Sequence, residues 1–576
     1  MTDSGQIQVF ILRRWILTGL YLAGMSLLIW RAVDLQVLNK EFLQDHGDAR
    51  ALRVVEIPAH RGMITDRNGE PLAISTPVSS IWAVPRKVLA SEGDMEPLAE
   101  LLEMTGEELE TLLTDRRGRE FVYLKRHVDP DFSDKVMALA IPGISLEQEF
   151  RRYYPAGEVT SHLIGFTNID DVGQEGLELA YDDWLRGSSG SKRVLKDRLG
   201  RVVEDIESIE TPRPGKTLEL SIDRRIQYLA YRELKAAVNK HNARAGTLVM
   251  LDAKTGEVMA MVGQPAYNPN NRSGLKSENL RNRAVTDVFE PGSTLKPFTI
   301  AAALQSGLYT PVTSIDTRPG QVKVGDHVIR DIQNYGVIDV ATVIKKSSNV
   351  GASKIALSLE PSMLRRMLTD FGFGQTTGSG FPGESAGYLS ISDNWSDVEQ
   401  ATISFGYGIA VTALQLAQAY MTLAADGMLL PVVFHKQETP APGQRVLPVK
   451  TAQQIRQMLE AVVQDEGTGR RASVNGYRVA GKTGTVHKSV AGGYSEDRYM
   501  SLFAGMAPAS DPRLVMVVMI DEPGGGEHFG GQVAAPVFSR VMSGALRLLN
   551  VPADNLPAFP EQILAGRSKP TQGGEQ

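Results

Sequence analysis

The longest apolar stretch of the chain lies near its N-terminus, where the run from Trp15 to Trp30 contains no charged residue. Arg14 and Arg31 flank this run, and a tryptophan stands at each end, where membrane helices place their interfacial anchors. The run is slightly shorter than the ~20 residues that a bilayer core requires, but arginines that snorkel to the interface extend its reach. The pattern therefore predicts one membrane-spanning anchor over residues 15–33.

A cleaved signal peptide and the buried core helix of a soluble domain are the alternatives for such a run. No Ala-x-Ala-like cleavage site follows it, so we favour an anchor that is retained. Arg13 and Arg14 precede the run, whereas acidic residues such as Asp34 and Glu41 follow it. This bias predicts that residues 1–14 are cytoplasmic and that the rest of the chain lies outside, which in a bacterium means the periplasm.

After the anchor, short strand-like and helix-like patterns predict a first globular domain over residues 50–215. Apolar residues on both sides of Asn68-Gly69 predict two strands joined by a tight turn. Residues 96–113 have a helical pattern, and charges interleaved with apolar residues predict a solvated hairpin over residues 192–201. The Pro-rich segment 211–215 marks the boundary with the next domain. We expect an α+β domain that is not catalytic.

The pattern over residues 216–550 predicts one large α/β domain. A strand-like run at 218–222 is followed by a helix over residues 225–239. Two further apolar runs, 248–251 and 258–262, are separated by a polar turn and predict a pair of strands.

Composition limits the classes of function. A chain of 576 residues exceeds one hydrophobic core, and its tail, residues 551–576, is rich in Pro and Gly and is expected to be disordered. The formal net charge of -6 gives no basic surface, so we expect no nucleic-acid partner. The lack of cysteine excludes disulfides, thiolate catalysis and cysteine-based zinc sites. The 9 histidines have no metal-ligand spacing, and we expect neither a metal nor another cofactor.

Three short motifs carry the candidate chemistry: Ser293-Thr294-Leu295-Lys296, Ser347-Ser348-Asn349 and Lys482-Thr483-Gly484-Thr485. A serine hydroxyl is a weak nucleophile at neutral pH and needs an adjacent base. Ser293 precedes an apolar helical run, so Lys296 is expected one turn further on and on the same face. The three motifs together predict a serine acyl-transfer site.

Each motif also occurs elsewhere in the chain, and context separates the copies. Ser-x-x-Lys recurs at Ser189 and Ser273, but both lie in stretches whose composition predicts loops. Lys254-Thr255-Gly256 falls between two predicted strands and is interpreted as a turn. Ser392-Asp393-Asn394 opens no helical run, whereas Ser347-Ser348-Asn349 leads directly into one.

Chemistry assigns roles to the motif residues. The N–H of Ser293, at a helix start, is a candidate oxyanion donor, and Lys296 must be partly neutral to accept the serine proton. Ser347 and Asn349 would extend the proton path and hold the substrate amide. Lys482 offers a fixed cation for a substrate carboxylate.

Residues 477–486 have the pattern of a strand, which at a sheet edge could pair with an extended peptide. Thr483 would then belong to the substrate-binding strand, and Gly484 would let the substrate backbone approach closely. The N–H of Thr485 would be the second oxyanion donor. A purely structural strand is the alternative.

With these residues in place, the chain resembles a class B penicillin-binding protein over nearly its whole length after the anchor. The resemblance also rests on Arg61-Gly62 with Asp66-Arg67-Asn68-Gly69, and on Gly173-Gln174-Glu175-Gly176. Phe529-Gly530-Gly531, followed by Ala535-Pro536-Val537-Phe538, most resembles the division-specific D,D-transpeptidase of Gram-negative bacteria. Val486-His487 departs from the small residue that this family commonly has after Lys-Thr-Gly-Thr, which bears on donor specificity.

The resemblance implies a serine β-lactamase/transpeptidase-like α/β domain, an antiparallel sheet flanked by helices, after an α+β pedestal. It implies that Ser293 attacks the penultimate D-Ala of a stem pentapeptide, expels D-Ala and passes the acyl group to an amine of a neighbouring stem peptide during septal cell-wall synthesis. β-Lactams would mimic the D-Ala-D-Ala donor. The pedestal would contact a polytopic glycosyltransferase and other divisome membrane proteins.

Several alternatives share the same motifs. An elongation-type transpeptidase differs in its partners and location. A D,D-carboxypeptidase or a β-lactamase would use water as the acceptor, and the pedestal would then have no role. A scaffold or β-lactam sensor would acylate without turnover. Turnover on a pentapeptide in the presence of an amine acceptor separates the transpeptidase from the hydrolases and from the scaffold.

Overall fold

The computed structural model describes residues 4–38, 52–91, 94–196, 202–392, 394–490 and 492–556, and residues 557–576 of the predicted tail lie outside them. The chain divides into two compact units, which are described separately below. The first comprises residues 1–60, 76–151 and 187–215, and the second comprises residues 61–75, 152–186 and 216–576. Residues 61–75 and 152–186, which the sequence pattern groups with the preceding domain, thus cluster with the second unit.

The N-terminal segment is a helix, α1 (Ser4–Val33), which continues into a π-helical turn, η1 (Asp34–Leu38). Its stretch Leu12–Leu38 has a mean hydropathy of 1.6 and is long enough to cross a membrane. The anchor expected over residues 15–33 lies within this stretch. None of the side chains in its most apolar window is buried, which suits a helix whose surroundings are lipid.

The first unit contains a three-stranded antiparallel sheet in the order β1-β6-β7, formed by β1 (Leu52–Ile57), β6 (Gly190–Lys196) and β7 (Val202–Glu210). Strands β6 and β7 form the hairpin that the charge pattern predicts. The other elements are α3 (Pro85–Leu89), α4 (Glu96–Leu101), α5 (Gly106–Asp115), β4 (Val122–Val128), α6 (Pro130–Ala138) and most of β5 (Ile144–Tyr153).

The helix expected over residues 96–113 is interrupted. Glu103 adopts a left-handed conformation with φ of 63°, which ends α4. Thr105 then begins α5 with a capping box, in which its side chain accepts from the N–H of Glu108 and its own N–H donates to the Glu108 carboxylate. Local capping therefore overrides the continuous apolar period, and Leu98 and Leu109 still reach the same core.

In the second unit, the segments around Arg61 and Glu178 meet in a buried ion network. The Arg61 guanidinium donates to Glu178 Oε2 and to Asp182 Oδ1, at 2.8 Å in each case, and Arg152 Nε donates to Glu178 Oε1 at 2.6 Å. Both arginines and Glu178 are buried. Buried charges need such partners, and the N–H of Gly173 also donates to Asp182 Oδ1 at 2.8 Å, so Arg61 and Gly173 hold the fold of this region together. The small elements of this region are β2 (Ile64–Thr65), η2 (Gly157–Thr160), α7 (Ser161–Ile164), α8 (Gly176–Ala180), α9 (Asp182–Arg186) and β8 (Leu218–Glu219). The longer strand β3 (Pro71–Ala83) begins here, and most of its residues belong to the first unit.

The core of the second unit is a five-stranded antiparallel sheet in the order β10-β9-β19-β18-β17. Its strands are β9 (Ala245–Asp252), β10 (Val258–Gln264), β17 (Ala480–Val490), β18 (Gly493–Ala507) and β19 (Leu514–Asp521). Every residue of β9, β10 and β19 is buried, because helices cover both faces, and this explains their continuous apolar runs. Strand β17, which carries the Lys-Thr-Gly-Thr motif, lies at the edge.

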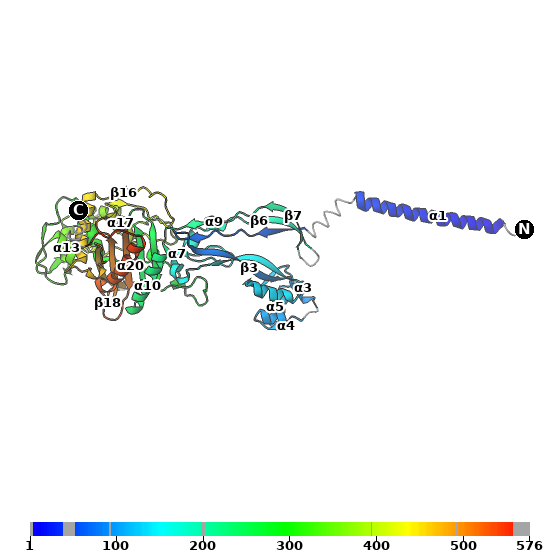
Figure 1. Ribbon diagram of the computed structural model, residues 1–576, viewed down its shortest axis with the longest axis horizontal. Coiled ribbons are helices and arrows are strands. Elements are labelled where there is room, and N and C mark those ends of the chain that lie inside the picture. Colours follow the sequence, from blue (N-terminus) through cyan, green and yellow to red (C-terminus); the bar gives the residue numbers. More distant parts are fainter. Residues whose placement is uncertain are drawn as a thin grey trace, which may run out of the picture. The chain divides into compact units, whose positions relative to one another are not determined.

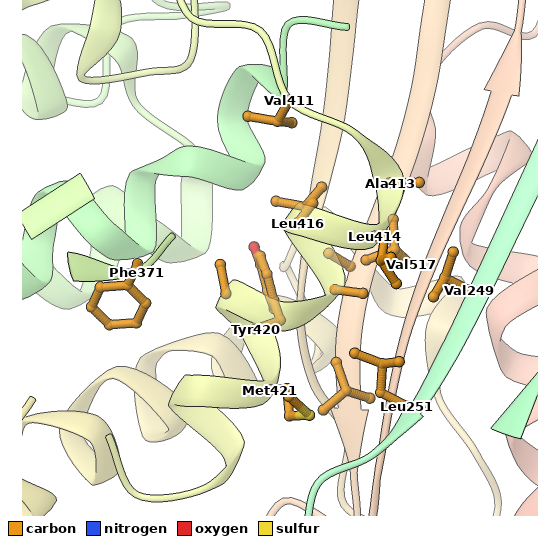
Figure 2. Close-up of a cluster of buried hydrophobic side chains, with 14 of the residues drawn as sticks. Val249, Leu251, Phe371, Val411, Ala413, Leu414, Leu416, Tyr420, Met421 and Val517 are labelled. Carbon is orange, nitrogen blue, oxygen red and sulfur yellow. The ribbon is translucent and has the colours of Figure 1, made fainter. Parts of the chain in front are cut away.

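Alternate residues of the central strands face two hydrophobic cores. Leu248 and Met250 pack against α10 (Arg224–Lys240) and α20 (Ala535–Leu548), which lie together in Figure 1. Figure 2 shows the other core, where Leu414 and Met421 of α17 (Ala413–Ala424) lie against Val249, Leu251 and Val517 of the sheet. The prediction of an antiparallel sheet flanked by helices is thus confirmed.

Helix α17 also supports the candidate nucleophile. The Tyr420 hydroxyl donates to the carbonyl of Thr294 at 2.9 Å, and its ring packs on Phe298 of α12 (Lys296–Gln305) with ring centroids 5.7 Å apart. Phe371 packs on the same Phe298 ring.

The remaining elements of the second unit are η3 (Ser277–Asn279), α11 (Arg283–Thr286), η4 (Gly292–Leu295), β11 (Ser314–Asp316), β12 (Gln321–Val324), β13 (His327–Arg330), β14 (Val337–Asp339), α13 (Val340–Lys346), α14 (Asn349–Leu357), α15 (Pro361–Asp370), α16 (Asp397–Ile403), β15 (Met428–Leu429), β16 (Gln444–Arg445), α18 (Val449–Val463), η5 (Arg470–Ala472) and α19 (Gly530–Val533).

Candidate active site

Ser293 lies in the short 3₁₀ turn η4, and α12 begins only at Lys296. In a 3₁₀ turn residues i and i+3 are eclipsed, so the two side chains lie directly above one another. Lys296 Nζ is 3.0 Å from Ser293 Oγ. The turn fits closely against strand β17, because a Cβ built on Gly292, which has φ of +53°, would lie 2.4 Å from Val486 Cγ2. Glycine at this position is therefore required by both conformation and space.

Lys296 is fully buried and is surrounded by oxygen atoms. Besides Ser293 Oγ, its Nζ contacts the Ser347 carbonyl at 2.6 Å, Asn349 Oδ1 at 2.7 Å and Ser347 Oγ at 3.1 Å. Burial, followed by the nearby charge of Lys482, lowers the pKa of Lys296 well below its ordinary value, while the charge of Asp331 opposes this shift. Lys296 is therefore poised to be neutral.

A neutral lysine has two N–H groups and one lone pair. Its shortest contacts are with two groups that can only accept, the Ser347 carbonyl and Asn349 Oδ1, and these use both N–H groups. The lone pair is then left to accept the hydroxyl proton of Ser293. The arrangement of acceptors thus orients Lys296 as a base for the nucleophile.

The Ser-Ser-Asn motif forms a sharp turn between two helices. Ser347 ends α13 with a left-handed backbone, φ of 62°, and Ser348 caps α14 by accepting from the N–H of Gly351 at 2.8 Å. Ser347 Oγ lies 2.9 Å from Lys482 Nζ as well as near Lys296 Nζ. The hydroxyl of Ser347 therefore connects the two buried lysines.

Asp331 fixes this turn, and the sequence analysis did not identify it. Its carboxylate accepts from the Ser348 hydroxyl at 2.6 Å and from the N–H groups of Asn349 and Val350 at 2.5 and 3.0 Å. Anionic acceptors suit the free N–H groups of a helix start. Asp331 follows β13, at no recognisable spacing from the motif, so only the fold reveals its role.

Strand β17 places the Lys-Thr-Gly-Thr residues on two opposite faces. Lys482 Nζ points inward, is fully buried, and donates to Ser347 Oγ and to the Thr483 carbonyl at 2.9 and 3.1 Å. Desolvation lowers the pKa of Lys482 to about 7. Thr483 and Thr485 line the cleft instead. Lys482 therefore lies beneath the cleft surface, where its amine contacts the cleft-lining Ser347 Oγ, and its role toward a substrate carboxylate stays a prediction.

Gly484 packs against the protein interior. A Cβ at this position would lie 3.1 Å from both Leu502 Cβ and Thr294 Cγ2. The missing side chain lets the edge strand lie close to the turn that carries Ser293, and the close approach of a substrate backbone stays a prediction. Gly484 is thus a packing requirement of the site.

The start of α19 covers the same strand. The N–H of Gly530 donates to Thr485 Oγ1 at 3.0 Å, and a Cβ on Gly530 would lie 2.3 Å from the carbonyls of Gly484 and Leu502. Because the Thr485 hydroxyl already accepts from Gly530, its own proton is available to a group in the cleft. The lack of space for a side chain at position 530 explains why a glycine follows Phe529.

The motifs meet at an open cleft of about 790 Å³. Ser293, Ser347, Asn349, Thr483 and Thr485 line it, together with Asp331, Thr468, Arg470, Arg471 and an aromatic wall. In this wall, the Tyr499 ring stacks on His528 at 4.1 Å and packs on His487 at 4.6 Å, with Phe529 beside His528. The expected site residues Lys296, Lys482 and Gly484 lie behind this surface.

A slightly larger cavity, of about 890 Å³, lies beside α10 and is lined by residues such as Glu70, Arg224 and Tyr228. No residue of the three motifs lines this cavity, so the volume of a cavity does not by itself identify the active site. Among the described residues, no group of three or more His, Cys, Asp or Glu side chains is arranged to hold a metal ion.

Comparison with known domains yields two matches. The penicillin binding protein transpeptidase domain matches residues 246–543, and the penicillin-binding protein dimerisation domain matches residues 56–220. The first match contains every motif residue of the cleft.

Full-length relatives cover nearly the whole chain. It is 44% identical over 94% of its length to a protein of Escherichia coli named peptidoglycan D,D-transpeptidase FtsI, covering 92% of that protein. It is 43% identical over 96% of its length to the probable peptidoglycan D,D-transpeptidase PbpC of Pseudomonas aeruginosa, covering 97% of it.

Solved structures agree. Penicillin binding protein 3 of Mycobacterium tuberculosis, complexed with aztreonam, is 30% identical, with a TM-score of 0.68 over 87% of this chain and 98% of that one. The transpeptidase domain of Burkholderia pseudomallei penicillin-binding protein 3 is 46% identical, with a TM-score of 0.54 over 58% of this chain and 98% of that one. The chain therefore belongs to the penicillin-binding protein transpeptidase family.

Proposed function

We propose that this protein is a peptidoglycan D,D-transpeptidase that cross-links stem peptides through an acyl-enzyme on Ser293. The observation that carries the assignment is the contact between Lys296 Nζ, fully buried, and Ser293 Oγ at 3.0 Å. A serine with a neutral lysine beside it has the base that a hydroxyl nucleophile needs. The relatives named as peptidoglycan D,D-transpeptidases support the identity of the substrate.

In the first half-reaction, the Ser293 hydroxyl gives its proton to Lys296 Nζ as Oγ bonds to the carbonyl carbon of the penultimate D-Ala. The N–H groups of Ser293 and Thr485 stabilise the resulting oxyanion. As the intermediate collapses, the C–N bond breaks and the leaving nitrogen takes a proton through Ser347 Oγ, which contacts both lysines. D-Ala leaves as a free amino acid, and the acyl group stays on Ser293.

In the second half-reaction, the amine of a neighbouring stem peptide attacks the ester carbonyl. It loses a proton to the same Ser347 and lysine network, and Ser293 Oγ recovers a proton from Lys296 as the peptide cross-link forms. The steps of the first half-reaction thus run in reverse with a different amine. Asn349, held by Lys296 at 2.7 Å and by the Arg330 carbonyl at 3.2 Å, offers its amide to the donor backbone.

We further propose that α1 and η1 anchor the chain in the bacterial inner membrane, with residues 1–14 in the cytoplasm and the catalytic domain in the periplasm. Arg13 and Arg14 on the N-terminal side support this orientation. Residues 50–215 serve as a pedestal that contacts a polytopic glycosyltransferase and other divisome proteins at the septum, and residues 216–550 form the penicillin-binding domain. A fluorescent fusion that labels the side wall instead of the septum would favour an elongation role.

The assignment of the nucleophile is tested by labelling with a fluorescent penicillin. Mass spectrometry should place the adduct on the peptide that contains Ser293, and Ser293→Ala should abolish labelling. Ser273→Ala, which alters an exposed Ser-x-x-Lys copy, is the matched control and should label normally. An adduct on Ser273 or on Ser189 would refute the site.

The reaction is tested with a pentapeptide donor and an amine acceptor. A transpeptidase gives the cross-linked product and free D-Ala, whereas a D,D-carboxypeptidase gives only the tetrapeptide. Acylation by penicillin without turnover of any peptide donor would point to a β-lactam-binding scaffold. A wild-type protein that only hydrolyses the donor would contradict the proposed transfer reaction.

A further inference from the structure

The amines of the two motif lysines lie beneath the surface of the catalytic cleft. Lys296 and Lys482 are fully buried and do not line the cleft, and their Nζ atoms are held by serine, asparagine and backbone oxygens. Burial also lowers the pKa of both amines. A peptide that ends in D-Ala-D-Ala carries a C-terminal carboxylate, which a cation on the cleft surface would attract.

Two arginines on the cleft wall provide permanent charge. Among the described residues that line the cleft, the lysine or arginine residues are Arg470 and Arg471. Their side chains are 75% and 55% exposed. A guanidinium keeps its proton at every usable pH and carries five N–H donors in a planar fork that matches a carboxylate. The cleft therefore has a fixed positive pole.

Both arginines are only loosely held. Arg470 forms an ion pair with Asp465 at 3.4 Å, and Arg471 forms one with Glu527 at 3.6 Å, both longer than a good charge-assisted hydrogen bond. Asp465 is itself 86% exposed. Exposed pairs of this kind contribute little to stability and exchange readily with another carboxylate.

The backbone that carries the arginines is firmly placed. Thr468 Oγ1 hydrogen-bonds Thr483 Oγ1 of strand β17 at 2.8 Å, and the N–H of Gly469 donates to the Val462 carbonyl at 2.9 Å. Ala472, at the end of η5, is fully buried. The arginine pair is thus attached to the same edge strand that presents Thr483 to the cleft.

We propose that Arg470 and Arg471 form a carboxylate-binding subsite that recognises an anionic group of the peptide substrate beside Thr483. The inference rests on the proposed transpeptidase function and assigns to this pair the charge recognition that the Lys-Thr-Gly-Thr motif suggests for Lys482. The Thr483 and Thr485 hydroxyls supply hydrogen bonds from the strand, and the guanidinium groups supply charge. Two carboxylates have the required chemistry, the C-terminal carboxylate of the donor and a carboxylate on the acceptor stem.

The test is the double variant Arg470→Gln/Arg471→Gln, in which glutamine keeps a polar side chain, although a shorter one, and removes both charges. Acylation is measured with a donor peptide whose C-terminus is free and with the same peptide as its C-terminal amide, at low and at high salt. The matched control, Arg232→Gln/Arg540→Gln, removes two exposed charges from α10 and α20, away from the cleft lining.

We expect kcat/KM for the free-acid donor to fall about tenfold or more relative to the amide, because charge-assisted contacts are lost. Salt should slow the wild type with the free acid and have less effect on the double variant. A second arm uses a neutral thioester donor with amine acceptors that carry or lack a carboxylate. If the double variant loses activity only with the acceptors that carry a carboxylate, the arginine pair binds the acceptor instead of the donor.

Equal effects of the double variant on charged and uncharged substrates in both arms would overturn the proposal. The same is true if the control variant reproduces the selective loss, because the cause would then be net charge and not this subsite. Wild-type protein that processes no peptide donor would instead contradict the transpeptidase function itself, so the two failures are distinguishable.

Discussion

Lys296 can act as a base only because the fold removes it from water and surrounds it with acceptors. Its Nζ contacts Ser293 Oγ, the Ser347 carbonyl and Asn349 Oδ1. Arginine would keep the positive charge but could not become neutral at any usable pH. Lys296→Arg should therefore lower the rate of acylation by penicillin by ~10²–10⁴, as expected for loss of a general base.

The measurement is the second-order acylation rate constant from stopped-flow fluorescence, with circular dichroism to verify folding. Lys450→Arg, at an exposed position of α18, is the matched control and should acylate normally. Acylation near the wild-type rate by a folded Lys296→Arg protein would refute the base assignment.

The burial of Lys482 also predicts a dependence of stability on pH. The pKa of Lys482 is about 7 in the folded protein, whereas the ordinary pKa of a lysine is 10.5. Between these two pH values the unfolded chain therefore binds more protons than the folded protein. The contribution of Lys482 to the free energy of unfolding therefore rises with pH from about 7 to 10.5 and is constant below 7. Lys482→Met removes this titration.

The expected result is that Tm of Lys482→Met, relative to wild type, is highest at pH 6.5 and falls as pH is raised to 9.5. Differential scanning calorimetry at the two pH values checks the sign. A Tm difference that is independent of pH would mean that Lys482 is not desolvated in the folded protein.

At the residue scale, the sequence identifies groups that belong to short motifs and misses groups that act through space. Ser293, Lys296, Ser347 and Asn349 follow from spacing and helix context, and the structure brings them together. Asp331 could not be found, because the acceptor of a helix cap can come from anywhere in the chain. The direction of Lys482 likewise depends on the strand's neighbours, which local pattern does not contain.

At the scale of elements, one carboxylate fixes the conformation of the turn between α13 and α14. Asp331 accepts from Ser348, Asn349 and Val350. Asp331→Asn keeps the shape but loses the charge and one acceptor, which should destabilise the second unit by ~1–3 kcal/mol and slow acylation. Asp326→Asn, at an exposed position of the β12–β13 hairpin that precedes Asp331, should change neither.

Urea unfolding followed by tryptophan fluorescence measures the first effect, and penicillin labelling measures the second. Asp331→Asn with normal stability and normal acylation would show that the helix start does not depend on the carboxylate.

The covering of strand β17 by α19 makes a second prediction at this scale. A side chain on Gly530 would collide with backbone carbonyls of Gly484 and Leu502, neither of which can move freely. Gly530→Ala should therefore lower Tm and weaken acylation together, because the strand must shift to relieve the contact. Gly118→Ala, where the added Cβ would meet nothing within 4 Å, is the matched control and should behave as wild type in calorimetry and labelling.

Elements were predictable where one local signal dominates. The β9–β10 pair and the β6–β7 hairpin follow from apolar runs that flank polar turns. The expected helix over residues 96–113 breaks at Glu103 because the capping box of Thr105 starts a new helix. Ser293 lies in a 3₁₀ turn before α12, where Gly292 packs backbone against backbone on Gly406, and such a contact between distant segments is not contained in the local pattern.

For the whole molecule, the family resemblance implies an antiparallel sheet flanked by helices, and the β10-β9-β19-β18-β17 sheet confirms it. The strand order is not a local property, since β9 pairs with β19 from the far end of the chain. The local pattern also could not predict that residues 61–75 and 152–186 cluster with the second unit. The ion network of Arg61, Arg152 and Glu178 that holds them there joins segments that are distant in sequence.

The separation of the anchor from the chemistry gives the last prediction. The residues that line the cleft fall between Ser293 and Gln532, whereas the only described stretch that could span a membrane is Leu12–Leu38. A variant without residues 1–38 should therefore appear in the soluble fraction and acylate with penicillin at the wild-type rate, while the full chain pellets with membranes. Ultracentrifugation and labelling of both fractions test this, with the truncated Ser293→Ala protein as the control for specific labelling. A truncated chain that still pellets as folded protein would show a second membrane contact, and one that is soluble and folded but unlabelled would show that the N-terminal helix is needed to form the site.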